Sequence, residues 1–98
     1  MYRITLSEQA RKEYLYFSQN GNQAILNKMK ALLEDIALHP YNGIGKPEPL
    51  KYELAGKWSR RINAEHRIVY SVHDETIEVY IFSMRYIILK NSCSISHL

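Results

Sequence analysis

The chain has 98 residues, an apolar content of 46% and a formal net charge of +3 at pH 7. This length suits a single domain, and the apolar content argues against intrinsic disorder. A single cysteine, Cys93, excludes an internal disulfide, and the sequence has neither a signal-type apolar run nor the roughly 20 apolar residues of a membrane-spanning helix. We therefore expect a cytoplasmic protein with no membrane partner.

The N-terminal segment predicts a strand followed by a helix. "YRITL" is a β-branched run typical of a strand, and Ser7 is the candidate N-cap of a helix from Glu8 to about Ser18. Thr5 and Glu8 also have the spacing of a capping box, which leaves the helix start open by two residues. The apolar stripe of this helix recurs at steps of three and four residues: Ala10, Tyr14 and Phe17.

A second helix is expected after "QNGN", in which Asn22 can act as N-cap. It should run from about Gln23 to Leu38, because Pro40 disfavours helical geometry at His39. Its predicted inner face consists of Ile25, Met29, Leu32, Leu33 and Ile36. Two helices joined by so short a break are expected to pack as an antiparallel hairpin.

The second half of the chain predicts a loop and three strands. "YNGIGKPEPL" is a loop by its glycine and proline content, and "GKWSRRIN", "HRIVYSV" and "IEVYIFSM" are the strands. Strands this close in sequence form an antiparallel meander most simply. The predicted class is therefore α+β: an N-terminal strand and a helical hairpin packed on a small, largely antiparallel sheet.

Positive charge is concentrated between Lys46 and Arg67, where six basic residues accompany three acidic ones. One interpretation is an ordinary solvated surface. The other is a face that binds phosphate groups. The aromatic residues, eight of them tyrosines, are either core residues or stacking surfaces for unpaired bases.

Strand parity sorts the residues of this segment onto two faces. In the third predicted strand, Arg67 shares a face with Val69 and Ser71, and the core face carries Ile68, Tyr70 and Val72. Glu65 joins the Arg67 face if the strand already runs straight at that point. A turn near Ala64 should bring Arg61 onto the strand beside Arg67, but the register between the two strands cannot be predicted.

Glu48 lies between Pro47 and Pro49, which restrict the backbone around it. It is either a solvated loop residue or a positioned carboxylate. Metal-independent RNA cleavage needs a base for the ribose 2′-hydroxyl and a cation for the charge that builds on the phosphorane. Glu48 is the candidate base and Arg67 the candidate phosphate clamp, and the residues expected to position the RNA backbone are Lys46, Lys51 and Arg61. No Cys, His or Asp spacing in the sequence suggests a metal site, and no cofactor is expected.

The block "KPEPLKYELAGKWSRRINAEHRIVYSV" resembles the signature of the YoeB-type toxins of the RelE superfamily, and "SEQARKEYLYF" and "MRY" also fit. The resemblance covers residues 1–86, expected to form one toxin domain followed by an atypical tail, 87–98. It implies a microbial-ribonuclease-like fold and a bacterial type II toxin that cuts mRNA in the ribosomal A site. It also implies a YefM-like antitoxin, and promoter DNA as a partner of the toxin–antitoxin complex only.

The same resemblance implies roles for individual residues. Glu48 matches the general base of the family and Arg67 its phosphate-stabilising arginine. Glu65, Lys51 and Arg61 match residues around the site. Through the "MRY" match, Arg85 and Tyr86 are added to the RNA-binding set.

The C-terminus departs from the family pattern. Members usually end in "RYHY", with a catalytic His and Tyr, whereas this chain places Ile87 and Ile88 there. An isoleucine can neither donate a proton nor bond a phosphate. Three functions therefore stay open: a weakened endoribonuclease, a catalytically inert module that still binds antitoxin and ribosome, or a general nucleic-acid binder.

Two further expectations concern the same end of the chain. The four histidines, His39, His66, His73 and His97, are expected to have structural or surface roles rather than to replace the missing one. An extended final strand through Leu89 would expose apolar residues, which favours self-association, for example as a homodimer.

Overall fold

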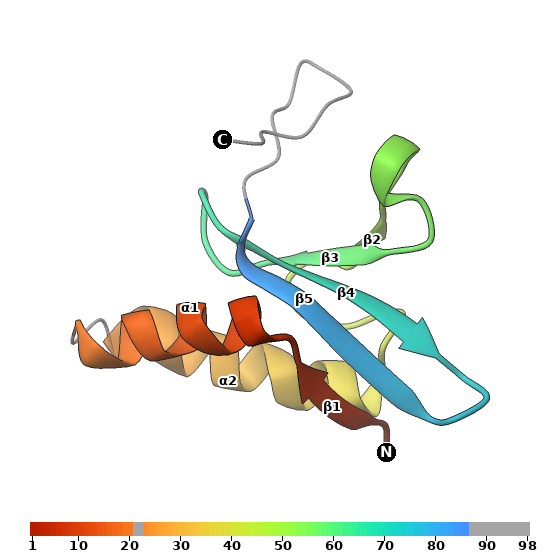
Figure 1. Ribbon diagram of the computed structural model, residues 1–98, viewed down its shortest axis with the longest axis horizontal. Coiled ribbons are helices and arrows are strands. Elements are labelled where there is room, and N and C mark those ends of the chain that lie inside the picture. Colours follow the sequence, from red (N-terminus) through yellow and green to blue (C-terminus); the bar gives the residue numbers. More distant parts are fainter. Residues whose placement is uncertain (21–22, 87–98) are drawn as a thin grey trace.

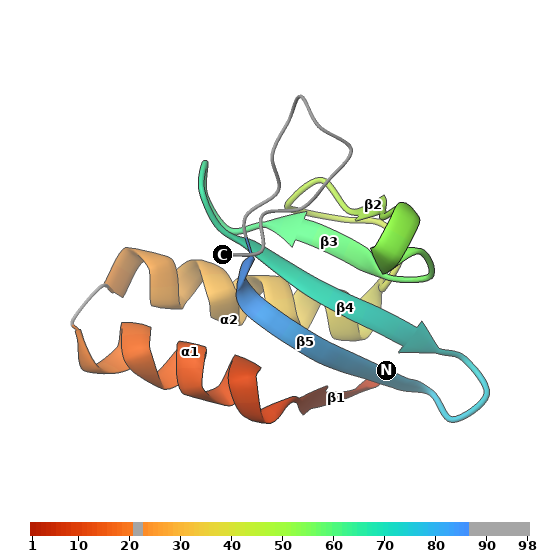
Figure 2. The same cartoon turned by 45° about the horizontal axis from the view of Figure 1, so that its top comes forward.

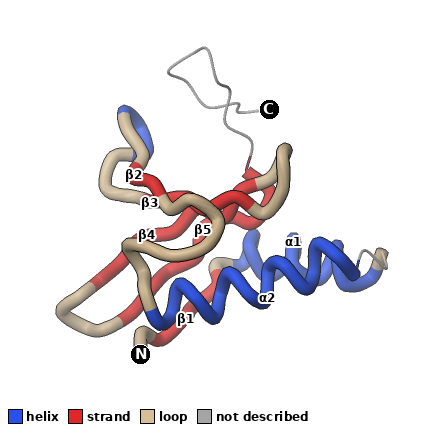
Figure 3. The backbone as a smooth tube through the Cα atoms, turned by 180° about the vertical axis from the view of Figure 1, so that it is seen from behind, coloured by secondary structure: helices blue, strands red, loops and turns tan. Residues whose placement is uncertain are grey.

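A five-stranded sheet and two α-helices form the fold of the computed structural model, which describes residues 1–20 and 23–86 (Figure 1). The elements are β1 (Arg3–Leu6), α1 (Glu8–Gln19), α2 (Gln23–Leu38), β2 (Glu48–Pro49), a 3₁₀ turn (Tyr52–Leu54), β3 (Trp58–Arg61), β4 (Arg67–His73) and β5 (Glu78–Tyr86). The two helices run side by side against one face of the sheet, and neither covers the other face (Figures 2 and 3). The predicted α+β class is confirmed.

The order of the strands in the sheet is β1-β5-β4-β3-β2. The predicted meander is present, because β3 pairs antiparallel with β4 and β4 antiparallel with β5. β1 lies at the far edge and pairs in parallel with β5, with Arg3 opposite Glu78. A parallel pair needs a long connection, and the helical hairpin is the first part of it.

The helix boundaries agree closely with the sequence. The side chain of Ser7 caps α1, because its Oγ accepts the Ala10 N–H at 2.9 Å. Thr5 lies inside β1, so the alternative start by a capping box is wrong. α2 ends at Leu38, as the approaching proline predicts. Asn22, the candidate cap of α2, lies outside the described residues.

The core lies between the helices and the sheet. Its buried members include Phe17 of α1, Met29, Leu32 and Ile36 of α2, and Ile68, Tyr70, Val79, Ile81 and Met84 of the sheet. The inner face of α2 is turned slightly from the predicted one: Leu26 and Ala37 are buried, whereas Ile25 and Leu33 are half-buried at its margin. Within residues 1–20 and 23–86, no helix is long and apolar enough to cross a membrane.

Asp74 joins three separate parts of the chain, because its carboxylate accepts hydrogen bonds from Tyr2 near the N-terminus and, at 2.7 Å, from Tyr41 after α2. The ring of Tyr41 also packs edge-on against Trp58, with centroids 5.2 Å apart. The bonds from the two tyrosines lower the pKa of Asp74, against the opposing effect of burial. The same contact with Asp74, helped by burial, raises the pKa of Tyr41 to about 12.

We expect Asp74 to make folding stability depend on acidity. Its pKa is lower in the folded than in the unfolded chain, so its contribution is present above the ordinary aspartate pKa of about 3.9 and is lost as the pH falls through the folded value. In urea unfolding, Asp74→Asn should therefore be less stable than the parent near neutral pH, and the gap should narrow toward about pH 3. Glu75→Gln, an exposed neighbour, is the control and should show no gap. A gap of constant size at both pH values would contradict this role.

Candidate nucleic-acid site

Glu48 lies on a strand rather than in a loop. The sequence predicted a loop over residues 41–50, and the segment is irregular except at Glu48 and Pro49, which form β2 and pair antiparallel with Ser59 and Trp58 of β3. The proline is compatible with this position because β2 is an edge strand, where a missing N–H disturbs no ladder. The Leu50 N–H continues the contact by donating to the Lys57 carbonyl at 2.8 Å. The backbone of Glu48 is thus held by the sheet as well as restricted by its two prolines.

Arg61 and Arg67 are direct cross-strand partners at the end of the β3–β4 pair. The sequence predicted neighbouring strands, and the structure adds the register. Cross-strand partners point to the same face, and Ser59, the partner of Glu48, lies two residues before Arg61 on β3. Glu48, Arg61 and Arg67 therefore share the face that the α-helices leave uncovered. Like charges directly opposite each other destabilise a sheet, so this pairing has an energetic cost.

The guanidinium of Arg67 lacks the partners that a half-buried cation usually has. Its Nη1 is buried without a hydrogen-bond partner, and no carboxylate in residues 1–20 and 23–86 lies within ion-pairing distance of it. Burial is the main cause that lowers the pKa of Arg67, the charge of Arg61 adds to it, and Glu48 acts in the opposite direction. Buried polar groups almost always have a partner, so an anion bound here would complete the site.

The other predicted phosphate contacts lie around this centre. Lys46 is exposed, lies two residues before Glu48 in the loop that enters β2, and has a left-handed backbone (φ 53°). Lys51 is exposed and begins the 3₁₀ turn. Glu65 is also exposed, but β4 begins only at Arg67, so Glu65 lies in the β3–β4 turn, and strand parity does not place it on the Arg67 face. Its carboxylate lies 3.7 Å from the His66 ring.

The side chain of Arg85 contacts α1, on the face of the sheet opposite to Glu48 and Arg67. Its guanidinium lies over the rings of Tyr16, 4.4 Å from the centroid, and Phe17, at 5.4 Å. The structure therefore directs Arg85 to the helix side of the sheet. Tyr86 is the Cα partner of Arg67 across β4 and β5, which brings the backbone of the "MRY" match to the site. The side chain of Tyr86 lies outside the described part of the chain, as do Ile87, Ile88 and His97.

The remaining histidines have local contacts. The ring of His66 packs edge-on against that of Phe17 in α1, with centroids 5.8 Å apart. His73 hydrogen-bonds to Ser71 at 2.8 Å, and His39 contacts Asp35 at 3.4 Å.

A groove continues the site along the sheet, and no motif in the sequence predicted it. Lys57 lies over the ring of Phe82, 4.8 Å from the centroid, beside Val69, which pairs with Ser59. The groove also includes residues of the α1 N-terminus and Leu54. Lys57 alternates in step with Ser59 and Arg61, so strand alternation was the sequence signal that could have placed it on the same face.

Comparison with known proteins places this arrangement in a family. Residues 6–87 match the family described as YoeB-like toxin of bacterial type II toxin-antitoxin system. The chain belongs to the YoeB-like toxin family. It is 45% identical to toxin YoeB of Synechocystis sp. over 84 residues, 86% of this chain and 94% of the relative. It is 44% identical to toxin YoeB of Escherichia coli K12 over 75 residues, 76% of this chain and 88% of the relative.

Solved structures of YoeB-like toxins share the fold. The chain superposes with a TM-score of 0.77 and 45% identity on YoeB in a heterotetrameric YoeB-YefM complex from Staphylococcus aureus, covering 88% of this chain and 97% of that one. A YoeB/ParE toxin from Agrobacterium tumefaciens gives a TM-score of 0.79 at 34% identity, with coverages of 85% and 95%. The resemblance stated from the sequence is thus confirmed. The YoeB-like match ends at residue 87, so positions 88–98 lie beyond it.

Proposed function

We propose that this YoeB-like toxin is a ribosome-dependent endoribonuclease that cleaves mRNA in the ribosomal A site. The observation that carries the proposal is the half-buried, unpartnered guanidinium of Arg67 beside Arg61, on the same face of the sheet as Glu48. Such a guanidinium can offer hydrogen bonds where negative charge develops.

The proposed reaction gives Glu48 and Arg67 separate roles. Glu48 takes the proton of the ribose 2′-hydroxyl, and the 2′-oxygen attacks the adjacent phosphorus. Arg67 stabilises the charge on the non-bridging oxygens, and the bond to the 5′-oxygen breaks to leave a 2′,3′-cyclic phosphate. The 5′-oxygen must gain a proton, and Ile87 and Ile88 cannot supply it. The residues proposed to position the RNA backbone are Arg61, Lys46 and Lys51.

Partners are proposed from the relatives. The S. aureus relatives were solved as a YoeB-YefM complex and as a YoeB dimer. We propose that this chain binds a YefM-like antitoxin in the bacterial cytoplasm, that it can form homodimers, and that promoter DNA is bound only by the toxin–antitoxin complex.

Primer extension on translating ribosomes tests the proposed activity. The chain is added beside a version carrying Ile87→His and Ile88→Tyr, and new mRNA ends are mapped to the A site. New mRNA ends in the A site produced by the unaltered chain support the proposal. If the altered version produces them and the natural chain does not, the chain itself is not an endoribonuclease.

A second candidate function is favoured by Ile87 and Ile88 alone: a toxin-fold module that binds antitoxin and ribosome without cutting RNA. Expression without antitoxin separates the two. Growth arrest that depends on Glu48 contradicts the inert module, and unimpaired growth together with antitoxin binding supports it.

A further inference from the structure

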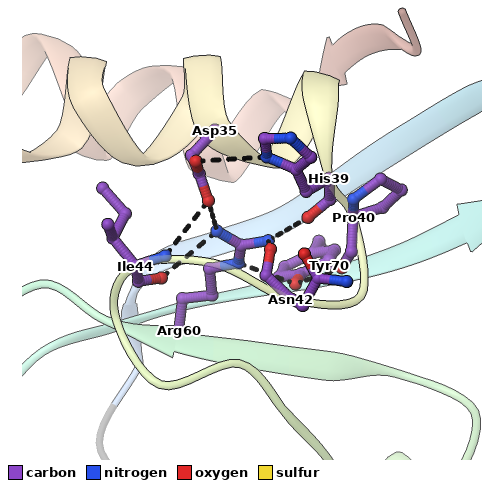
Figure 4. A network of polar contacts seen from close by, with 7 residues as sticks. All are labelled: Asp35, His39, Pro40, Asn42, Ile44, Arg60 and Tyr70. Atoms are coloured by element: carbon purple, nitrogen blue, oxygen red, sulfur yellow. Dashed lines mark hydrogen bonds and ion pairs between the residues drawn. The ribbon is translucent and has the colours of Figure 1, made fainter.

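Arg60 is completely buried, although it carries a charge and has Arg61 as its neighbour. Its guanidinium is surrounded by oxygen atoms, most of them from the segment that leads from α2 toward Glu48 (Figure 4). It donates to the carboxylate of Asp35, to the hydroxyl of Tyr70 and to the main-chain carbonyls of His39, Asn42 and Ile44. One side chain thus holds three separate points of the loop.

Other contacts close this network. The Tyr70 hydroxyl donates to the Pro40 carbonyl at 2.8 Å, and the Ile44 N–H donates to Asp35 at 3.1 Å. Burial raises the pKa of Asp35, but the hydrogen bonds from Arg60, Ile44 and His39 outweigh it, so the net shift is downward. The carboxylate therefore stays ionised beside Arg60, and the loop is fixed by charge-assisted bonds.

The loop reaches Glu48 directly from this network. The carbonyl of Gly45 accepts the Arg61 N–H at 2.7 Å, and Glu48 then pairs with Ser59 on the same strand. Only two residues separate these two attachments to β3. Arg60 holds the loop from the core side, while the side chain of Arg61 belongs to the site face, because consecutive strand residues point to opposite faces.

We propose that Arg60 is a positioning residue for Glu48, acting through Asp35 and the carbonyls of residues 39–44 to fix the base on the face of the sheet that carries Arg67. The inference rests on the proposed function of Glu48. A general base must lie within hydrogen-bond reach of its proton, and a displacement of about 1 Å can lower the rate by about 10²-fold. The second arginine of "SRR" binds substrate, and the first one aligns the site without touching it.

Gly43 allows a matched test of this role. Its φ is +128°, and a Cβ there would lie 1.9 Å from the Asp35 carboxylate, so Gly43→Ala must displace the partner of Arg60. Gly56 has a φ of +92°, and a Cβ there would have no atom within 4 Å. Gly56→Ala therefore introduces a similar backbone strain without touching the network, and it is the control.

Both variants are made in the chain carrying Ile87→His and Ile88→Tyr, and ribosomal cleavage is measured where circular dichroism shows each protein to be folded. We expect Gly43→Ala to lower kcat by about 10-fold or more with little change in KM, and Gly56→Ala to leave both near the parent values. A purely structural role would lower the folded fraction but not the kcat of the folded protein. Equal kcat values for the two variants would overturn the proposal.

Asp35→Asn is the second variant, in case Gly43→Ala does not fold. Its control is Glu34→Gln, the same acid-to-amide change at an exposed position of α2. Amide exchange at Arg61, whose N–H binds Gly45, is followed by NMR in all proteins. Faster exchange in Gly43→Ala or Asp35→Asn than in their controls supports the clamp, and unchanged exchange overturns it even if the parent shows no cleavage. Absence of cleavage in the parent contradicts the proposed function and not the clamp.

Discussion

Glu48→Gln is expected to lower the rate of mRNA cleavage by about 10²–10⁴-fold, the usual contribution of a general base. Glutamine has the shape of glutamate but cannot take the 2′-hydroxyl proton. The measurement is single-turnover cleavage on ribosomes stalled at a defined codon, in the chain carrying Ile87→His and Ile88→Tyr. Because Glu48 is exposed on an edge strand, the substitution should leave the thermal unfolding midpoint nearly unchanged.

The control for this prediction is Glu75→Gln, the same chemical change in the exposed β4–β5 turn. Its rate should equal that of the parent. If Glu48→Gln cleaves as fast as Glu75→Gln, then Glu48 is not the base, and the carboxylate on β2 is an ordinary surface residue.

Ile87→His with Ile88→Tyr is expected to raise the cleavage rate of the natural chain by about 10²–10⁴-fold, because general acid–base groups contribute that much. The leaving 5′-oxygen then has a proton donor, and the tyrosine can hydrogen-bond to phosphate. The cellular counterpart is a stronger growth arrest at equal expression without antitoxin.

Ile87→Ala with Ile88→Ala is the matched control, since it removes the same two side chains without adding a functional group. A faster rate in the His-Tyr version alone indicates that the natural chain lacks the functional groups that His and Tyr supply. A similar increase in rate in both versions would mean that the isoleucines obstruct the site. No increase in either version would mean that residues 87 and 88 do not limit the cleavage rate.

The sequence could predict those parts of the structure that local rules control. The Ser7 cap, the end of α2 before Pro40, and the opposite faces of Arg60 and Arg61 all follow from capping, proline geometry and strand alternation. The resemblance carried the assignment of Glu48 and Arg67, and the fold is consistent with it because both lie on one face.

Long-range pairing determined what could not be predicted. Nothing local indicates that Glu48 pairs with Ser59, since a glycine- and proline-rich segment has the composition of a loop. The register between β4 and β5 shifts between Arg67 and Val69 and again between Val69 and Tyr70. The guanidinium of Arg85 lies over Tyr16, on the helix side of the sheet, which is the face that regular alternation from Ile81 also gives.

The central claim is that Glu48 and Arg67 act on one ribose–phosphate junction, and a double-mutant cycle tests it most directly. Single-turnover cleavage rates are measured for the Ile87→His, Ile88→Tyr chain, for Glu48→Gln, for Arg67→Gln and for the pair. If both residues serve the same transition state, the double variant should be hardly slower than the slower single variant. Losses that multiply would mean that the carboxylate and the guanidinium act independently, and would contradict the account.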